Sequence, residues 1–270
     1  DTAATQVAYN HVVAVPTEPM ARIAFEKAGI AKPGVPLVTM GTLYPDEAQA
    51  AIAEVAGTVG APVSGFGSGW ICDTADSGSL YFFDHDLSGV GRDYPMPVLS
   101  GRHQAHNAAL AIAMIGAQKR IPVSDTAIRM GLLRARWPAR MQILRAGPLT
   151  ALASSAKVML DGGHNANAGQ AIADALPDDP QSLHLIIGMI EGKDPRALID
   201  PLGDRIRTLT AVPVPGHDCH PAEAFGPDVR AAANVEQALL SLPDDGYPIL
   251  IAGSLYLAGE VLRLNDELPD

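Results

Sequence analysis

The sequence has few cysteines and few basic residues. It contains 2 cysteines in 270 residues, Cys72 and Cys219, which lie far apart and lack the close spacing of metal ligands. A disulfide scaffold is therefore not expected, and the pattern favours a reducing, cytoplasmic location. The 19 lysines and arginines are outnumbered by 30 aspartates and glutamates, which gives a formal charge of −11. Such a chain repels a phosphate backbone, so we expect no nucleic-acid partner.

Long apolar runs are also missing. No run approaches the roughly 18 apolar residues of a membrane-spanning helix, and no charged-then-apolar leader opens the chain, so we expect no membrane partner. The hydrophobic content of 47% still suffices for one large core or two ordinary ones. The sequence begins at Asp1, in a stretch that resembles the middle of a protein, so we expect further residues upstream.

The periodicity of apolar residues changes near Trp137. Before it we predict short strands over 61–94, with further strands at 11–15 and 35–40 and helices at 20–28, 45–60, 103–117 and 124–133. After it, strands at 157–160, 183–187, 209–214 and 249–252 alternate with helices at 166–176, 195–202, 235–242 and 255–264. Continuous apolar strands between amphipathic helices predict a mostly parallel, doubly wound sheet. We therefore expect an α/β protein with domains at 1–136 and 137–270.

The strongest candidate site is the stretch 161–165, Asp-Gly-Gly-His-Asn, between a predicted strand and a predicted helix. Its glycines permit a tight turn and close approach of a ligand. Asp161 is placed to accept from ribose hydroxyls, and a helix N-terminus favours anionic groups. An ordinary turn with Asn165 as helix N-cap explains the pattern equally well.

Three other stretches place polar groups at helix ends or at the domain boundary. His103, His106 and Asn107 fall within one helical turn, where they either contact a base or sugar or merely cap the helix. Arg140, after Trp137 and Pro138, either reaches a nucleotide phosphate between two domains or is an ordinary surface residue of a linker. The stretch 253–256, Gly-Ser-Leu-Tyr, is either an anion site or an N-cap.

Three patterns favour simpler interpretations. Lys27, in the last turn of helix 20–28, suits the negative end of the helix dipole. The glycine-rich stretch 65–69 is not followed by a predicted helix, so it is interpreted as a loop rather than a dinucleotide site. Asp84-His85-Asp86 is more typical of a solvated hairpin tip than of a metal site.

Taken together and in order, these motifs resemble the folylpolyglutamate/dihydrofolate synthase family of the Mur ligase superfamily. The matching stretches are 26–30 (EKAGI), 101–109 (GRHQAHNAA), 137–140 (WPAR), 161–165 (DGGHN), 193–194 (KD) and 253–260 (GSLYLAGE). The resemblance covers nearly the whole chain, and the last stretch is especially particular to this family. It implies the remnant of a Mur-ligase-type central ATPase domain that binds ATP and folate, followed by a Rossmann-like C-terminal domain with a mostly parallel sheet.

The resemblance implies a ligase that forms a carbon–nitrogen bond. In this family ATP phosphorylates a carboxylate of dihydropteroate or a reduced folate, and the amino group of L-glutamate attacks the acyl phosphate. The implied cofactors are ATP and Mg²⁺, and the implied state is a monomer. Two alternatives stay open, which are a Mur-type ligase of a peptidoglycan precursor and a noncatalytic nucleotide-binding relative.

The family's functional residues map onto five positions. Lys27 is similar to the family's carbamylated lysine, whose carbamate helps to hold Mg²⁺. Asn107, Arg140 and Asp161 resemble its ATP contacts on the base, phosphate and ribose sides, and His164 resembles a neighbour of these contacts.

The sequence also departs from the family. The phosphate loop G-x-x-x-x-G-K-[ST] occurs nowhere in the 270 residues. An Asp-His pair and a short loop are missing between Pro19 and Met20, and Ala166 stands where the family usually has proline. We expect the parent protein to carry both missing segments and the 270 residues alone to be inactive in phosphoryl transfer.

Overall fold

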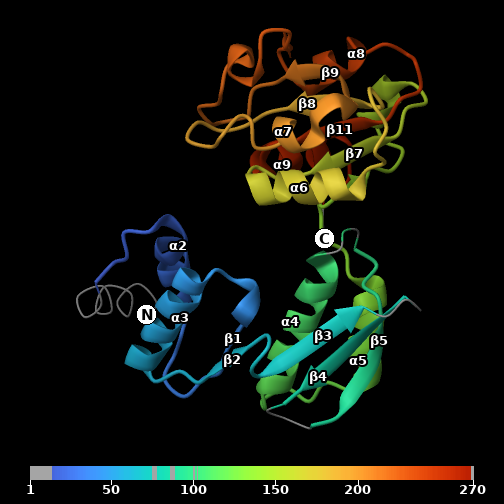
Figure 1. Cartoon of the computed structure of the whole chain (residues 1–270). Helices are drawn as coiled ribbons and strands as arrows, with labels where there is room; N and C mark the ends of the chain where they lie inside the picture. Colours follow the sequence, from blue (N-terminus) through green and yellow to red (C-terminus); the bar gives the residue numbers. More distant parts are fainter. Residues whose placement is uncertain (1–13, 75–77, 86–88, 100, 102, 269–270) are drawn as a thin grey trace. The chain divides into compact units, whose positions relative to one another are not determined.

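The computed structural model of the chain describes residues 14–74, 78–85, 89–99, 101 and 103–268. The chain forms two compact units, which Figure 1 colours along the sequence. Unit 1 comprises Asp1–Val98 and His103–Ala135, and unit 2 comprises Leu99–Arg102 and Arg136–Asp270. The assignment of an ATP/folate-binding domain to 1–136 and a ligase domain to 137–270 stays a prediction.

The first part of unit 1 is a helix pair beside two short strands. Helix α2 (Pro19–Ala28) packs on α3 (Asp46–Val59) through a core that includes Phe25 and Val55. Strands β1 (Leu37–Thr39) and β2 (Val63–Gly65) pair in parallel. Helix α3 ends because Gly60 adopts φ 74°, and its N–H bonds back to the last turn. Of the strand predicted at 11–15, residues 11–13 lie outside the described residues, and 14–15 are not in a strand.

The second part of unit 1 is a three-stranded antiparallel sheet with two helices. The sheet has the order β3 (Trp70–Thr74), β4 (Ser79–Asp84), β5 (Gly91–Pro95), so the predicted β-rich region is confirmed. Helix α4 (His103–Ala117) packs one face against Trp70 and Phe82. Helix α5 (Asp125–Arg134) begins at the predicted cap, where the Ala127 N–H donates to Ser124 Oγ at 3.1 Å.

Unit 2 contains a six-stranded sheet that is parallel except at one edge. Its order is β10-β9-β8-β11-β7-β6, and only β6 runs antiparallel to its neighbour. The predicted mostly parallel sheet is therefore confirmed. The strand bounds are β6 (Gln142–Ile143), β7 (Val158–Asp161), β8 (Leu183–Ile187), β9 (Ile206–Ala211), β10 (Arg230–Ala231) and β11 (Ile249–Ala252).

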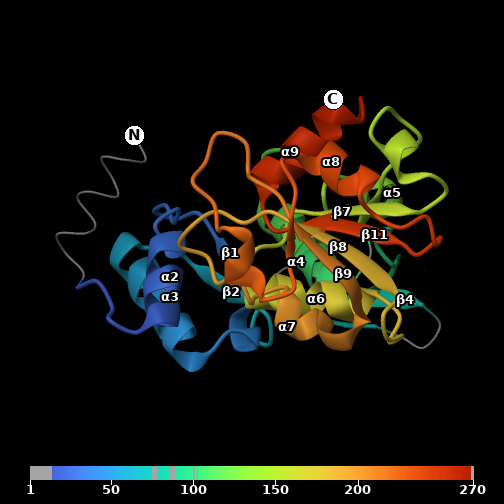
Figure 2. The same cartoon turned by 90° about the horizontal axis from the view of Figure 1, so that it is seen from above.

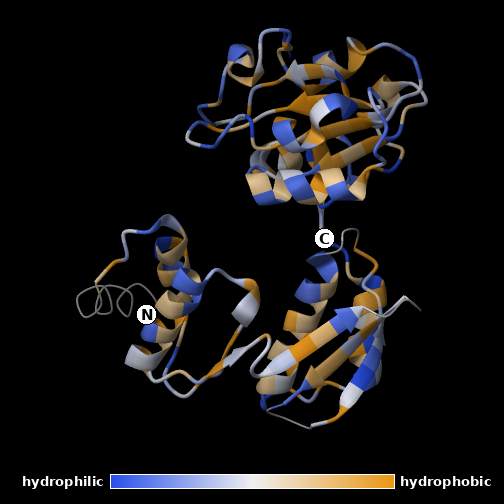
Figure 3. Cartoon of the chain, viewed as in Figure 1, coloured by the Kyte–Doolittle hydropathy of each residue, from blue (hydrophilic) through white to orange (hydrophobic). Residues whose placement is uncertain are grey.

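Helices cover both faces of this sheet, as Figure 2 shows. Successive side chains of a strand point to opposite faces, so Leu160 packs towards α8 and α9 while Met159 packs towards α6 and α7. The strands are apolar on both sides, and Figure 3 colours them accordingly. The helix bounds are α6 (Ala166–Ala175), α7 (Ile199–Leu202), α8 (Val235–Leu240) and α9 (Leu255–Leu264). The described residues also form the single-turn 3₁₀ helices η1 (Gly41–Leu43), η2 (Thr150–Ala153), η3 (Gly203–Arg205) and η4 (Ala222–Phe225).

Two predicted elements of unit 2 are displaced or shortened by three residues or more. The helix expected at 195–202 exists only at 199–202, because the Asp194 carboxylate and carbonyl accept the N–H groups of Arg196 and Ala197 in a turn. The strand expected at 209–214 lies at 206–211, because Pro213 and Pro215 lack the N–H that a central strand donates. Within the described residues, no helix has the length and apolar character needed to cross a membrane.

Candidate functional site

The loops that follow β7 and β11 leave the same edge of the sheet and turn to opposite faces. Asp161 and Ala252, the last residues of these strands, are register partners. Strand β7 leads into α6 on one face, and β11 leads into α9 on the other. In open α/β sheets, the crevice between diverging loops at the carboxyl ends of strands is the usual ligand site. Stretches 161–165 and 253–256 therefore meet at one candidate site.

Asp161 holds two backbone segments of this site together. Its side chain is buried, with the residue 4% exposed. Oδ1 accepts the Gly163 N–H at 2.7 Å, and Oδ2 accepts the Met141 N–H at 2.8 Å. The first bond shapes the loop after β7, and the second fixes the segment that carries Arg140. Asp161 is therefore a positioning residue, and its expected contact with a ribose stays a prediction.

Arg140 is exposed, and the residues on either side of it have strained backbone angles. The residues on either side, Ala139 and Met141, have φ angles of 55° and 45°, in the left-handed region that suits glycine. The Ala139 carbonyl accepts the Gly162 N–H at 2.8 Å, which holds the strained segment against the loop after β7. No carboxylate of the described chain pairs with Arg140, so its guanidinium is available to a phosphate.

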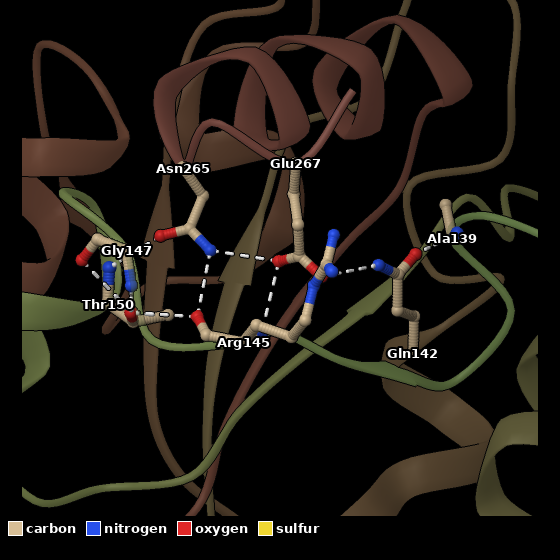
Figure 4. A network of polar contacts seen from close by, with 7 residues as sticks. All are labelled: Ala139, Gln142, Arg145, Gly147, Thr150, Asn265 and Glu267. Atoms are coloured by element: carbon tan, nitrogen blue, oxygen red, sulfur yellow. Dashed lines mark hydrogen bonds and ion pairs between the residues drawn. The ribbon is translucent and has the colours of Figure 1, made fainter. Parts of the chain in front are cut away.

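A polar network supports the Arg140 segment from the other side (Figure 4). The Ala139 N–H donates to Gln142 Oε1 at 2.9 Å, and Gln142 Nε2 donates to Glu267 Oε1 at 3.3 Å. The other oxygen of Glu267 accepts the Arg145 N–H at 3.0 Å and Asn265 Nδ2 at 2.9 Å. Burial alone would raise the pKa of Glu267, but the hydrogen bonds from Asn265 and Arg145 outweigh it and hold that pKa below its ordinary value.

The hydrogen-bond partner of His164 shows which of its ring nitrogens carries the hydrogen. Nδ1 lies 3.0 Å from the Gly162 carbonyl oxygen, which can only accept, so Nδ1 carries the hydrogen. When the ring is neutral, Nε2 is therefore an acceptor, and the residue is half-buried. Asn165 Oδ1 accepts the Ala168 N–H at 2.9 Å, so the N-cap interpretation of this residue is confirmed.

Glycines let the loops after β7, β8 and β11 pack closely against one another here. A Cβ atom on Gly162 would clash with the Leu255 side chain. Gly253 has φ +114°, and a Cβ atom there would lie 2.7 Å from the carbonyl oxygen of Gly188. Ser254 Oγ accepts the Tyr256 N–H at 3.1 Å, so Ser254 is an N-cap of α9.

Sequence reasoning missed the loop that follows β9. The rings of His217 and Tyr256 lie 3.8 Å apart between centroids, beside the start of α9. His220 Nε2 lies 2.7 Å from the Lys193 carbonyl oxygen and ties this loop to the one after β8. The signal was available, because loops after parallel strands gather at one sheet edge.

Lys27 and Asn107 belong to unit 1. Lys27 lies exposed in the last turn of α2. Asn107 lies exposed on α4 and donates from Nδ2 to Gln104 Oε1 at 3.1 Å. No hydrogen bond within the described part of unit 1 joins Lys27 to Asn107. Their expected contacts with Mg²⁺ and the adenine base stay predictions.

Two of the remaining interpretations fall on strand ends. Stretch 65–69 forms turns that lead into β3, so the prediction that no helix follows it is confirmed. Asp84 ends β4, which pairs with β5 in an antiparallel hairpin as expected, but it is 7% exposed, so the expected solvation was wrong for this residue. Its partner in the motif, Asp86, lies outside the described residues.

Comparison with known proteins identifies relatives across nearly the whole chain, although no family model matches it. The folylpolyglutamate synthase of Lacticaseibacillus casei is 33% identical over 257 residues, which are 88% of this chain and 56% of that protein. The dihydrofolate synthase/folylpolyglutamate synthase of Bacillus subtilis is 26% identical over 89% of this chain and 57% of its own length. The chain thus spans somewhat more than half the length of these curated relatives.

Solved structures give the same result. The folylpolyglutamate synthase of Mycobacterium tuberculosis superposes with a TM-score of 0.72 at 26% identity, over 96% of this chain and 62% of that one. Escherichia coli FolC superposes with a TM-score of 0.72 at 26% identity, over 91% of this chain and 57% of that one. The fold, the ordered motifs and the relatives agree, and the chain belongs to the folylpolyglutamate/dihydrofolate synthase family of the Mur ligase superfamily.

Proposed function

We propose that this protein is an ATP-dependent ligase that adds L-glutamate to dihydropteroate or to a reduced folate. In the proposed reaction, ATP phosphorylates a substrate carboxylate, the glutamate amino group attacks the acyl phosphate, and ADP and phosphate leave. The observation that carries the proposal is the 33% identity to the L. casei synthase across 88% of the chain. The substrates would be small molecules, and we propose a cytoplasmic monomer.

In the proposed reaction, the nucleotide would bind at the carboxyl edge of unit 2. The M. tuberculosis relative was solved with ADP and AMPPCP, and E. coli FolC with DHPP and ADP. In this chain Arg140 would neutralise phosphate charge, the N-terminus of α6 would add donors beside it, and His164 would lie next to these contacts. Asp161 would hold the Arg140 segment in place, and Asn107 of unit 1 would contact the base. Closely packed glycine loops would help to keep water from the acyl phosphate.

Magnesium fits the described residues only in part. A carbamate on Lys27 would supply one oxygen ligand, as expected from the family. The described residues contain no group of three or more His, Cys, Asp or Glu side chains that could hold a metal ion. The remaining ligands would therefore be water, ATP oxygens or residues beyond those described.

A noncatalytic nucleotide-binding role is the second candidate. It stays the alternative because the 270 residues, which span 56% of the L. casei synthase, contain no G-x-x-x-x-G-K-[ST] loop. A ligase needs the lysine and the backbone amides of such a loop to neutralise the phosphoryl group during its transfer. A binding protein needs only the nucleotide contacts proposed above.

The first test is the intact mass of the protein purified from its source, compared with the 28.2 kDa of these residues. A second test incubates that protein with ATP, Mg²⁺, L-glutamate and dihydropteroate, and measures ADP and the glutamylated product. A parallel reaction replaces dihydropteroate with a peptidoglycan precursor. Product with the pteroate alone supports the proposal, and product only with the precursor contradicts it. ATP binding without any product supports the noncatalytic role.

A further inference from the structure

Unit 1 contains a hollow that none of the expected site residues uses. Its volume is about 530 Å³, and it lies between strands β4 and β5, the C-terminal half of α4 and the connection from α4 to α5. Small-molecule sites commonly have volumes of this size. Asn107 and Ile115 both lie on α4, but at 1.5 Å per residue the hollow at Ile115 is roughly 12 Å farther along the helix axis. The hollow is therefore separate from the residue expected to contact a base.

Much of the wall and mouth of the hollow is apolar. Ile112 of α4 is buried in its wall, beside Phe82 of β4. Three branched side chains that also line it remain in solvent, with Val90 57%, Ile121 68% and Val123 40% exposed. Single exposed apolar residues are ordinary, but a group that surrounds one hollow indicates a binding surface.

Two cations share this hollow with the apolar residues. Lys119 lines it from the α4–α5 connection and makes no ion pair or hydrogen bond with any described residue. Arg92 lines it from β5 and contacts the hydroxyl of Tyr94. Burial raises the pKa of Tyr94, and Asp125 adds to this shift against the opposing effect of Arg92. The phenol is therefore neutral and keeps its hydrogen.

The negative groups nearby are already engaged. Asp125 is paired with Arg129, with Oδ2 2.6 Å from Nε. Asp84 lines the hollow but is 7% exposed and has its own interaction. In a chain with a formal charge of −11, this hollow is a place where cations face an apolar surface. An anion with an apolar body would match this hollow, because its charge would face the cations and its body would face the apolar surface.

We propose that this hollow binds a small organic anion, with an aromatic or branched aliphatic body and one carboxylate, sulfonate or phosphate group. The body would lie against Ile112, Ile115 and Val123. The anionic group would lie between Lys119 and Arg92. The site belongs to unit 1 alone and does not depend on the ligase activity.

Two fluorescent probes of nearly equal shape test the proposal on the whole protein. The first, 8-anilinonaphthalene-1-sulfonate, carries an apolar body and one anionic group. The second, N-phenyl-1-naphthylamine, has the same ring system without the sulfonate. Each is titrated into the wild type and into Lys119→Gln, Arg92→Gln and the matched control Arg120→Gln. Arg120 adjoins Lys119 but does not line the hollow.

We expect Lys119→Gln and Arg92→Gln each to weaken the binding of the sulfonate probe by about fivefold to tenfold, because each removes one charge-assisted contact. These two substitutions should leave the affinity for the neutral probe unchanged. Arg120→Gln should change the affinity for neither probe. Methyl NMR of the wild type locates the probe, with shifts expected at Ile112, Ile115 and Val123. Equal sulfonate affinity in all three variants overturns the proposal, as does probe binding without shifts at those methyls.

Discussion

Nε2 of His184 lies 3.0 Å from Oδ1 of Asp245, at the edge of the unit 2 sheet opposite the candidate site. His184 is 1% exposed, and its Nδ1 lies 2.8 Å from Thr208 Oγ1. Asp245 Oδ2 also accepts Arg207 Nε at 2.8 Å, and Arg207 lies over the Tyr247 ring. These contacts join β8, β9 and the loop before β11. The hydrogen bond from His184, assisted by Arg207, lowers the pKa of Asp245 to about 2.

The lowered pKa predicts a loss of stability in acid. The folded-state pKa of Asp245 is about 2 against an ordinary 3.8, so the ionised carboxylate stabilises the fold above the ordinary value. This contribution falls as the pH drops from 3.8 towards about 2. We expect Asp245→Asn to lower the free energy of unfolding at pH 7 and to flatten its decline over that pH window. Urea unfolding from pH 7 to pH 2 measures both effects.

The matched control for this prediction is Asp244→Asn. Asp244 is exposed, adjoins Asp245 and makes no ion pair with any described residue. Its replacement should leave the acid decline of the wild type intact. The same decline in Asp245→Asn as in this control would mean that His184 and Arg207 do not stabilise the ionised carboxylate.

Glu267 predicts a second stability effect. Its side chain is 5% exposed and accepts from the Arg145 N–H and from Asn265. Truncation in Glu267→Ala leaves the Arg145 N–H and one hydrogen of Asn265 Nδ2 without an acceptor, so we expect a loss of about 2–3 kcal/mol in the free energy of unfolding. Chemical unfolding of unit 2 measures it. The exposed Glu191→Ala is the control and should stay within about 0.5 kcal/mol of the wild type. Equal stability of the two variants would contradict the network.

Two glycine substitutions should have opposite signs. Gly253→Ala places a Cβ atom 2.7 Å from the Gly188 carbonyl at φ +114°, and we expect it to cost about 2–4 kcal/mol. Gly259 lies in α9 with nothing within 4 Å of its Cβ position, so Gly259→Ala should stabilise the protein by about 0.5–1 kcal/mol. Thermal unfolding midpoints measure both effects. A midpoint of Gly253→Ala at or above the wild-type value would refute the close packing of the loops after β8 and β11.

The sequence predicts elements well where periodicity is long and unbroken. Helices α4 and α9 and strands β8 and β11 have the predicted bounds, because their apolar patterns run from end to end. Strands β6 and β10 were missed, since each has only two residues and its pairing depends on distant partners. The bounds of β9 were displaced because the apolar run continues past Ala211 into residues that leave the sheet.

The candidate site was predictable in its parts but not in their connections. Glycines and an aspartate after a strand indicate stretch 161–165 from sequence alone. The bond between Asp161 and the Met141 N–H joins residues 20 apart, and no local pattern encodes it. The strained φ angles beside Arg140 and the contact between His217 and Tyr256 likewise depend on tertiary packing.

The role of Asp161 can be separated from a ribose contact. Asp161→Asn keeps the shape of the side chain but replaces one acceptor oxygen with an NH₂ group, so either Gly163 or Met141 loses its acceptor. We expect a loss of about 1–3 kcal/mol in the free energy of unfolding. Arg140→Gln, at an exposed position, should change stability by less than about 0.5 kcal/mol and weaken nucleotide binding by roughly tenfold.

Calorimetric titration with ATP and with inorganic tripolyphosphate then distinguishes the two roles. If Asp161 acts by holding the Arg140 segment, Asp161→Asn weakens the binding of both ligands, because both present phosphates to Arg140. If Asp161 contacts the ribose, the substitution weakens ATP alone, because tripolyphosphate has no sugar. The geometry of the Oδ2 bond to Met141 favours the first outcome. Unchanged tripolyphosphate affinity in Asp161→Asn, together with weakened ATP binding, would reverse that conclusion and assign Asp161 to the ribose.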